Sequence, residues 1–249
     1  QNSQDMENLR TEKIQMETNQ QIKNANAYGV LFDLDGVIID SETEYTRIWG
    51  EIESRFPTGV PDFPLVIKGT TLPHILDTYF ADEPVRSQVV EMLREREMTL
   101  PYRPVKGAFE FLDALAANGI PCAIVTSSNE EKMSTLYQRL PGLRERFASI
   151  VTSGDVAHSK PSPEGYLLAA RRLGLKPENC CVFEDSFSGL EAGRRAGGAV
   201  IALATTNPRK ALEGKADMVI DDFSGMTVDA LFNLFPAREA TGSDSTAKG

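Results

Sequence analysis

The sequence contains little cysteine and little histidine. Its 249 residues include three cysteines and two histidines. The cysteines are Cys122 and the adjacent pair Cys180 and Cys181, a spacing that suits neither a disulfide framework nor a C-x-x-C metal or redox site. His74 and His158 are too isolated for a zinc cluster. We therefore expect buried free thiols and a reducing, cytoplasmic compartment.

The chain also lacks a membrane-length apolar run and a cluster of basic residues. Its longest apolar runs, such as residues 199–204, have strand length, well below the roughly 20 residues of a membrane helix. Lysine and arginine number 26 against 36 aspartates and glutamates, so the net charge is −10. Because an acidic chain repels a phosphate backbone, we expect neither nucleic acid nor a membrane as a partner. A small phosphorylated metabolite remains compatible, since a metal ion can invert the charge of a site.

The pattern along the chain divides it into five parts. Residues 1–26 and 237–249 are polar and are interpreted as tails, the first without the apolar core of a secretory signal. In residues 27–43 and 102–236, short apolar strands alternate with helical patterns. This alternation predicts an α/β fold, a Rossmann-like parallel sheet with helices on both faces. Residues 44–101 carry only helical patterns and predict an inserted, all-helical cap domain.

Individual elements follow from the same patterns. The predicted strands are 28–32, 120–125, 180–183 and 199–203, and the clearest predicted helices are 85–98, 163–173 and 189–196. Three serines are predicted to start helices: Ser41 and Ser128 in capping boxes, and Ser162 as an N-cap. A hinge is expected near Thr43 and residues 101–104. The oligomeric state gives no signal in the sequence, and a monomer is the default expectation.

Polar side chains gather where the predicted strands end. In an open parallel sheet, ligands bind beyond the carboxyl ends of the strands. Carboxylates at two strand ends, hydroxyls at a third and a lysine in a nearby loop indicate a site for a metal and a phosphate. The residues concerned are Asp33, Asp35, Thr126, Ser127, Ser128, Asn129, Lys160, Glu184 and Asp185.

Four motifs in this order resemble those of the haloacid dehalogenase-like superfamily, and more closely its beta-phosphoglucomutase-like branch with a helical cap. They are Asp-Leu-Asp-Gly-Val at 33–37, Val-Thr-Ser-Ser at 125–128, Ser-Lys-Pro-Ser-Pro at 159–163, and Glu-Asp-Ser-Phe-Ser-Gly-Leu-Glu-Ala-Gly at 184–193. The resemblance covers about residues 28–220. Each motif alone is weak, and their order and spacing carry the identification.

The resemblance implies the chemistry of the site. Asp33 would attack phosphorus and form an aspartyl-phosphate, and Asp35 would protonate the leaving oxygen and then activate water. Mg²⁺ would be bound by Asp33, the backbone carbonyl of Asp35, and Asp185, with Glu184 binding or supporting it. A dehalogenase expels halide without a proton or a metal, so Asp35 together with the acidic pair indicates phosphoryl transfer.

The same resemblance assigns the phosphate-binding groups. Thr126 would donate its hydroxyl to the transferring phosphoryl group, and Lys160 would balance charge among phosphate and carboxylates. Ser127, Ser128 and Asn129 are further candidates for phosphate or substrate contacts. Ser128 has an alternative role as the start of a helix, and both roles are compatible because a helix N-terminus attracts anions.

Three functions stay open on the sequence alone. A phosphatase of a small phosphorylated metabolite, such as a sugar phosphate, is favoured; the alternatives are a beta-phosphoglucomutase-like phosphohexomutase and a non-enzymatic binding protein. The mutases carry a cap histidine where this chain has Tyr45, and a cap arginine where it has Leu72. Loss of a bidentate phosphate clamp favours the phosphatase. Lys68, Arg94 and Arg96 are candidates to replace the arginine.

Overall fold

A computed structural model describes residues 27–67 and 72–235 of the chain. Its centre is a six-stranded sheet in the order β3-β2-β1-β4-β5-β6, and every neighbouring pair is parallel. The strands are β1 (Gly29–Phe32), β2 (Cys122–Val125), β3 (Ser149–Val151), β4 (Cys180–Glu184), β5 (Ala199–Leu203) and β6 (Met218–Ile220). The predicted Rossmann-like parallel sheet is confirmed.

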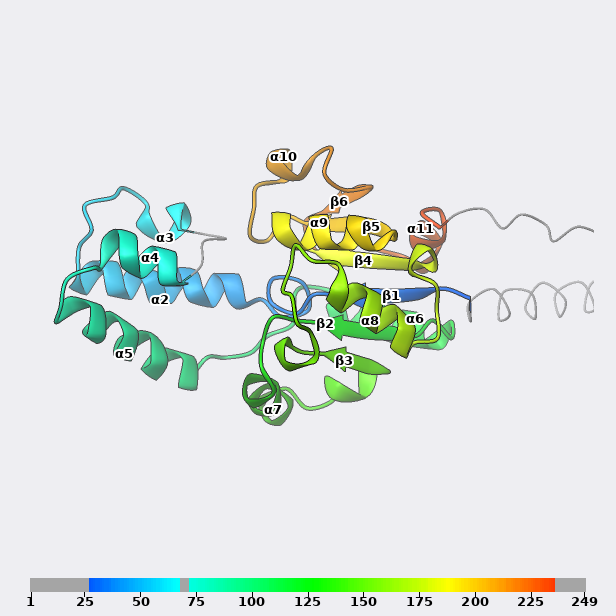
Figure 1. The fold of residues 1–249 in the computed structure, drawn as a ribbon, viewed down its shortest axis with the longest axis horizontal. Helices are drawn as coiled ribbons and strands as arrows, with labels where there is room; N and C mark the ends of the chain where they lie inside the picture. Colours follow the sequence, from blue (N-terminus) through cyan, green and yellow to red (C-terminus); the bar gives the residue numbers. More distant parts are fainter. Residues whose placement is uncertain (1–26, 68–71, 236–249) are drawn as a thin grey trace, which may run out of the picture.

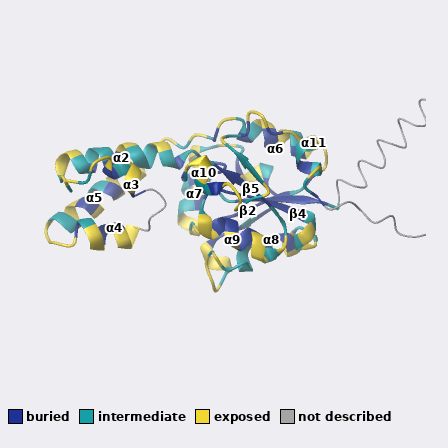
Figure 2. Cartoon of the chain, turned by 90° about the horizontal axis from the view of Figure 1, so that it is seen from above, coloured by how far each residue is buried: buried dark blue, intermediate teal, exposed yellow. Residues whose placement is uncertain are grey.

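Both faces of the sheet are covered by helices. Because side chains alternate along a strand, Val30 and Phe32 enter one core cluster while Leu31 enters another. Helices α6 (Ala108–Ala117), α7 (Glu130–Arg139) and α11 (Val228–Phe232) pack on the first face. Helices α8 (Glu164–Arg172), α9 (Phe187–Ala196) and α10 (Arg209–Leu212) pack on the second. Figure 2 shows α6 and α11 on one side of the sheet and α8 and α9 on the other.

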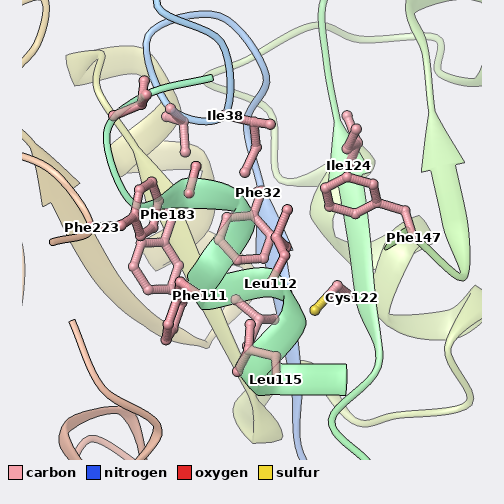
Figure 3. Close-up of a cluster of buried hydrophobic side chains, with 14 of the residues drawn as sticks. Phe32, Ile38, Phe111, Leu112, Leu115, Cys122, Ile124, Phe147, Phe183 and Phe223 are labelled. Carbon is pink, nitrogen blue, oxygen red and sulfur yellow. The ribbon is translucent and has the colours of Figure 1, made fainter. Parts of the chain in front are cut away.

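Aromatic side chains fill the first face just below the strand ends. The ring of Phe32 stacks on that of Phe183 with centroids 4.9 Å apart, and Phe111 from α6 stacks on Phe223 at 5.5 Å (Figure 3). Phe32 and Phe183 are the residues next to Asp33 and Glu184, respectively. The packed rings therefore hold the ends of β1 and β4 side by side.

Four helices and no strand occupy residues 41–67 and 72–98. They are α2 (Ser41–Arg55), α3 (Phe63–Val66), α4 (Leu72–Tyr79) and α5 (Val85–Met98). Their buried side chains form a separate core that includes Trp49, Phe63 and Phe80. Figure 1 shows this helical unit beyond the carboxyl ends of the strands. The inserted helical cap is confirmed. Its predicted limits, 44 and 101, stay a prediction, and α2 already begins at Ser41.

The two chain segments that lead to the cap run next to each other. Ile39 and Pro104 form an antiparallel bridge, and the Val105 amide donates to the Ile38 carbonyl at 2.9 Å. A core side chain also binds the returning segment: the Arg139 guanidinium, at the end of α7, donates to the carbonyls of Met98 and Leu100. Both connections to the cap are thus fixed to the core at their bases.

Two of the three predicted helix caps are wrong by one residue each. Asp40, not Ser41, caps α2 and accepts from the Thr43 amide at 3.3 Å. Asn129, not Ser128, caps α7, accepting from the Lys132 amide at 2.9 Å. Helix α8 has Pro163 at its N-cap position, and the predicted cap Ser162 accepts from the Glu164 amide through its hydroxyl at 3.3 Å. A second polar residue, Asp40 or Asn129, stands beside Ser41 and Ser128, so the local sequence locates the start of α2 and α7 better than the residue that caps them.

The three cysteines are free and buried, as expected. Burial raises the pKa of the Cys122 thiol to about 12. Within residues 27–67 and 72–235, no helix combines the length and apolar character needed to cross a membrane. The remaining short helices are η1 (Arg144–Arg146), η2 (Ser153–Asp155) and η3 (Pro177–Asn179).

Candidate active site

Three of the predicted site residues, Asp33, Glu184 and Asp185, meet at the centre of the sheet edge. Strands β1 and β4 are neighbours, but the chain continues from β1 towards β2 on one side and from β4 towards β5 on the other. A crevice forms at such a switch point, where ligands of open α/β sheets bind. Asp33 follows β1, its amide donating to the Phe183 carbonyl at 3.0 Å, and Glu184 and Asp185 come at the end of β4.

Three carboxylates lie close together in this crevice. Ligand oxygens of Asp33, Glu184 and Asp185 are all within 4.8 Å of one another. The Lys160 ammonium lies between two of them, 2.6 Å from Asp33 Oδ1 and 2.6 Å from Glu184 Oε1. It also donates to the Val125 carbonyl at 3.0 Å. One lysine therefore neutralises part of an otherwise negative, largely buried cluster.

Glu184 has hydrogen bonds on both carboxylate oxygens. Besides Lys160, the Tyr166 hydroxyl donates to Oε1 at 2.7 Å. The Asp185 amide and the Ser186 hydroxyl donate to Oε2 at 3.1 and 3.2 Å. The side chain is fully buried. A carboxylate held by so many donors is well placed to orient its neighbours and has little free capacity for a metal.

The Asp185 side chain packs closely against the turn that follows β1. The Thr206 hydroxyl donates to Asp185 Oδ2, and the Asn207 amide donates to the Asp185 carbonyl at 3.0 Å. Gly36 has φ of 76°, and a Cβ there would lie 2.1 Å from Asp185 Oδ2. Glycine at this position is therefore required both by the backbone conformation and by the approach of the carboxylate.

Burial and the neighbouring carboxylates raise the pKa of both Asp33 and Asp185. Burial, followed by the Glu184 carboxylate, raises the pKa of Asp33 to about 7, against the opposing effect of Lys160. Burial and the Asp33 carboxylate likewise raise the pKa of Asp185 well above its ordinary value. The Asp33 and Glu184 carboxylates raise the pKa of Lys160 in spite of its burial. The cluster thus holds more negative charge than it can stabilise alone, which a cation would relieve.

Asp35 lies beside this cluster and has a cation of its own. The Lys132 ammonium from α7 is 2.8 Å from Asp35 Oδ2, and the Ser128 hydroxyl is 3.4 Å from the same oxygen. The Asp35 side chain is 35% exposed, whereas that of Asp33 is 13% exposed. The two predicted catalytic aspartates therefore differ in access to water, as a nucleophile and an acid–base group would.

The residues after β2 have different positions. Thr126 is buried, and its hydroxyl accepts from the Ser128 amide at 3.0 Å. Ser127 is exposed, and the side-chain oxygen of Asn129 is occupied by its helix cap. Ser128 contacts the site directly through Asp35, and Thr126 contacts Ser128. Phosphate binding by Ser127 and Asn129 stays a prediction.

Sequence reasoning missed Lys132, Tyr166 and Thr206. Lys132 binds Asp35 from 97 residues away, and Tyr166 binds Glu184 from the first turn of α8. Neither stands in a recognised motif. A helical position facing the strand ends was the available signal for Lys132, which is three residues after the α7 cap. Thr206 follows β5, where a strand-end search extended to the fifth strand would have found it.

On the cap side, Tyr45 and Glu97 line a cavity together with Lys132, the partner of Asp35. The Tyr45 hydroxyl donates to Glu97 at 2.8 Å, and burial, Glu97 and then Asp35 raise the pKa of Tyr45. Leu72 is 43% exposed. Of the candidates to replace a cap arginine, Arg96 binds Glu51 at 2.7 Å and Lys68 lies outside the described residues. Arg94 is exposed at the same cavity, between cap and core.

The chain is similar in sequence and in fold to several named proteins. The chain is 32% identical to a validoxylamine A 7'-phosphate phosphatase of Streptomyces hygroscopicus subsp. limoneus, covering 78% of this chain and 93% of the relative. It is 32% identical to hexitol phosphatase A of Escherichia coli, over 80% and 93%. A solved structure of a putative beta-phosphoglucomutase from Thermotoga maritima superposes with a TM-score of 0.61 at 27% identity, over 78% and 94%. The model of the haloacid dehalogenase-like hydrolases matches residues 29–197, and the chain belongs to that family.

Proposed function

We propose that this hydrolase is a Mg²⁺-dependent phosphatase of small phosphorylated metabolites, acting through an aspartyl-phosphate on Asp33. The observation that carries the proposal is the contact of Lys160 with both Asp33 and Glu184 at the switch point of the sheet. This contact joins three separate motifs in one site. The names of two relatives, a validoxylamine A 7'-phosphate phosphatase and a hexitol phosphatase, support the substrate class.

The residues present fit Mg²⁺. Mg²⁺ prefers hard oxygen ligands and few carboxylates. Asp33 and Asp185 each have one carboxylate oxygen without a hydrogen bond within the described residues. We assign these two oxygens and the Asp35 carbonyl as ligands, and Glu184, whose oxygens are occupied, as their support. When bound, Mg²⁺ would reduce the repulsion between Asp33 and a phosphate dianion.

The steps then follow from the positions of the two aspartates. An Asp33 oxygen attacks phosphorus, the bond to the ester oxygen breaks, and the leaving oxygen takes a proton from Asp35. A water molecule next gives a proton to Asp35 and attacks the phosphorus of the aspartyl-phosphate. This releases inorganic phosphate and restores both side chains. Thr126 and Lys160 hold the phosphoryl group through both transfers.

The phosphohexomutase is the second candidate, and the solved beta-phosphoglucomutase is the observation in its favour. The cap argues for the phosphatase. Tyr45, at the position of the mutases' histidine, is bound to Glu97, and Leu72 stands at the position of their arginine. A hydrophobic side chain cannot clamp the second phosphate of a bisphosphate intermediate.

We further propose that the cap moves about a hinge at Thr43 and residues 101–104, with residues 44–101 as the moving unit. The hydrogen bond from the Val105 amide to the Ile38 carbonyl would lie in its fixed base. The hydrogen bonds from Arg139 to Met98 and Leu100 would have to open or shift as the cap moves. A cytoplasmic location and a monomeric state remain predictions, and the free, buried cysteines support the former.

Phosphate release from a panel of phosphorylated metabolites tests the function. Wild-type protein should release phosphate only with Mg²⁺, and a bisphosphohexose should not convert the reaction into hexose 6-phosphate formation. Asp33→Asn should lower kcat by more than about 10³-fold, since it removes the nucleophile. Asp35→Ala should lower kcat by about 10² to 10⁴-fold. Near-normal rates in Asp33→Asn would refute the mechanism, and hexose 6-phosphate as main product would make the chain a mutase.

A further inference from the structure

The Asp35 side chain is held on one of its two carboxylate oxygens. The Lys132 ammonium lies 2.8 Å from Oδ2, and the Ser128 hydroxyl makes a longer contact of 3.4 Å with the same oxygen. Within the described residues, Asp35 Oδ1 has no hydrogen bond. In the proposed reaction Asp35 gives a proton to the leaving oxygen and takes one from water, and one carboxylate oxygen is enough for both transfers. Oδ1 is the oxygen left for the proton.

The place of Lys132 on α7 is explained by Asp35 and not by the stability of the helix. Lys132 is in the first turn, three residues after the cap Asn129, and its amide donates to the Asn129 side chain at 2.9 Å. A cation there faces the positive end of the helix dipole, which disfavours it. Met133 and Leu136 are fully buried and fix the rotation of the helix. Lys132 therefore reaches Asp35 from a fixed base, and the salt bridge offsets the unfavourable position.

The position of Lys132 would also allow a second role. Lys132 is among the residues that line a cavity of about 420 Å³ between cap and core, together with Tyr45, Glu97 and Asn129. Since an ammonium has three hydrogens to donate, a leaving group in this cavity could bind Lys132 as well. Such binding would depend on hydroxyl or charged groups of the substrate, whereas the positioning of Asp35 would not.

We propose that Lys132 is a positioning residue for the proton transfers of Asp35. By holding Oδ2 it turns Oδ1 towards the reacting oxygen, first that of the leaving group and then that of water. The inference rests on the proposed phosphatase function and adds a residue that none of the sequence motifs contains. Because it acts through Asp35, Lys132 should matter most where the leaving oxygen needs a proton to depart.

The test compares phenyl phosphate with p-nitrophenyl phosphate in the presence of Mg²⁺. The two esters are similar in shape and offer Lys132 no hydroxyl or second charge, but phenolate is the poorer leaving group and gains more from a proton. Lys132→Gln should lower kcat/KM by about tenfold or more for phenyl phosphate and by less than about threefold for p-nitrophenyl phosphate. Lys132→Arg, which keeps a charged donor, should restore much of the loss.

A double-variant cycle separates positioning of Asp35 from direct binding of the leaving group. It is measured with the ester of the metabolite panel that is hydrolysed fastest. In an Asp35→Ala background, Lys132→Gln should have little further effect, because the lysine then has no carboxylate to hold. Lys176→Gln is the matched control: it removes the same charge from an exposed position before β4, at the opposite edge of the sheet, and should leave both aryl esters unchanged.

Equal loss on both aryl esters, no loss on either, or the same loss with and without Asp35 would overturn the inference, while phosphate release by the wild-type protein would still uphold the proposed function. If the wild-type protein releases phosphate from no ester, the proposed function fails and the inference fails with it. Thermal unfolding confirms that each variant is folded. Lys132→Met, which keeps the apolar stem of the side chain, takes the place of Lys132→Gln if the latter does not fold.

Discussion

Glu184 shows how a single residue in this site depends on its surroundings. It has no exposed surface, and five groups from three segments donate to it: the Lys160 ammonium, the Tyr166 hydroxyl, the Asp185 amide, and the amide and hydroxyl of Ser186. A buried carboxylate is costly unless its oxygens are hydrogen-bonded. These donors also fix the position from which Glu184 supports Asp185 and Lys160.

Removing one donor should therefore affect both stability and metal binding. Tyr166→Phe deletes the hydroxyl that donates to Glu184 at 2.7 Å. We expect the free energy of unfolding to fall by about 1.5–3 kcal/mol, the range for hydrogen bonds to charged groups, and the Mg²⁺ concentration for half-maximal activity to rise. Tyr137→Phe is the control, since no hydrogen bond of the Tyr137 hydroxyl is found among the described residues. Urea unfolding and a Mg²⁺ titration measure the two effects, and equal behaviour of the variants would contradict this role of Tyr166.

Motif residues could be predicted from sequence, and their partners could not. Asp33, Lys160 and Glu184 come together as expected, because parallel strands bring their carboxyl ends to one edge of the sheet. Lys132 and Tyr166 lie on helices, where the side chain that turns towards the strand ends depends on helix rotation and packing. A single sequence does not encode that rotation in a short pattern.

At the scale of elements, length decided which predictions succeeded. Helix α5 has the predicted bounds, 85–98, and strands β4 and β5 lie where the apolar runs placed them. Strands β3 and β6 have three residues each and were not predicted, because so short a segment shows no periodicity. They lie at the two edges of the sheet, so the centre that carries the site was predicted and its borders were not.

The packing of α9 against β4 gives a prediction about glycine. A Cβ at Gly189 would lie 1.9 Å from Glu184 Cδ, whereas a Cβ at Gly50, in the interior of α2, meets nothing within 4 Å. We expect Gly189→Ala to lower the free energy of unfolding by about 1–3 kcal/mol through overpacking and to reduce activity strongly. Gly50→Ala should raise stability by about 0.5–1 kcal/mol and keep activity. Denaturant unfolding and phosphate release measure both, and a fully active Gly189→Ala would refute the tight fit around Glu184.

At the scale of the whole molecule, the carboxylate cluster links stability to metal and pH. The folded pKa of Asp33, about 7, exceeds its ordinary value of 3.8, so the metal-free folded state binds more protons than the unfolded state between these pH values. The contribution of Asp33 to stability should therefore fall as pH rises through this window.

Binding of Mg²⁺ should offset this loss of folding stability at higher pH. At a hundredfold excess over Kd, a ligand of the folded state adds about 2.7 kcal/mol, which corresponds to a Tm increase of roughly 5–10 °C for a chain of this size. Thermal unfolding at pH 5 and pH 8, about the two ends of the titration, with and without Mg²⁺ measures it. Asp33→Asn should weaken the response. An unchanged Tm at saturating Mg²⁺ would show that the cluster does not hold the metal.

The buried thiols report on global unfolding. Cys122, Cys180 and Cys181 are at most 4% exposed, and burial raises the pKa of Cys122 and Cys180 to about 12. Because the thiolate is the reactive form, a thiol reagent at pH 8 should label none of the three cysteines in the native protein. In urea it should label all three, at the rate at which the protein unfolds. Rapid labelling of the native protein would place at least one cysteine at the surface.

Helix α7 has a consequence for the exchange of caps between related enzymes. Lys132 and Arg139 are seven residues apart on one face of the helix; the first binds Asp35 and the second binds the carbonyls of Met98 and Leu100. Consider a chimaera in which the cap of a related enzyme, the donor, is joined to the core of this chain, the recipient, between residues 101 and 102. The carbonyls of residues 98 and 100 would then come from the donor, while Arg139 would come from the recipient. A graft that keeps residues 98–103 with the recipient core would preserve the hydrogen bonds of Arg139 to these carbonyls. It would thereby also keep α7 in the position from which Lys132 binds Asp35.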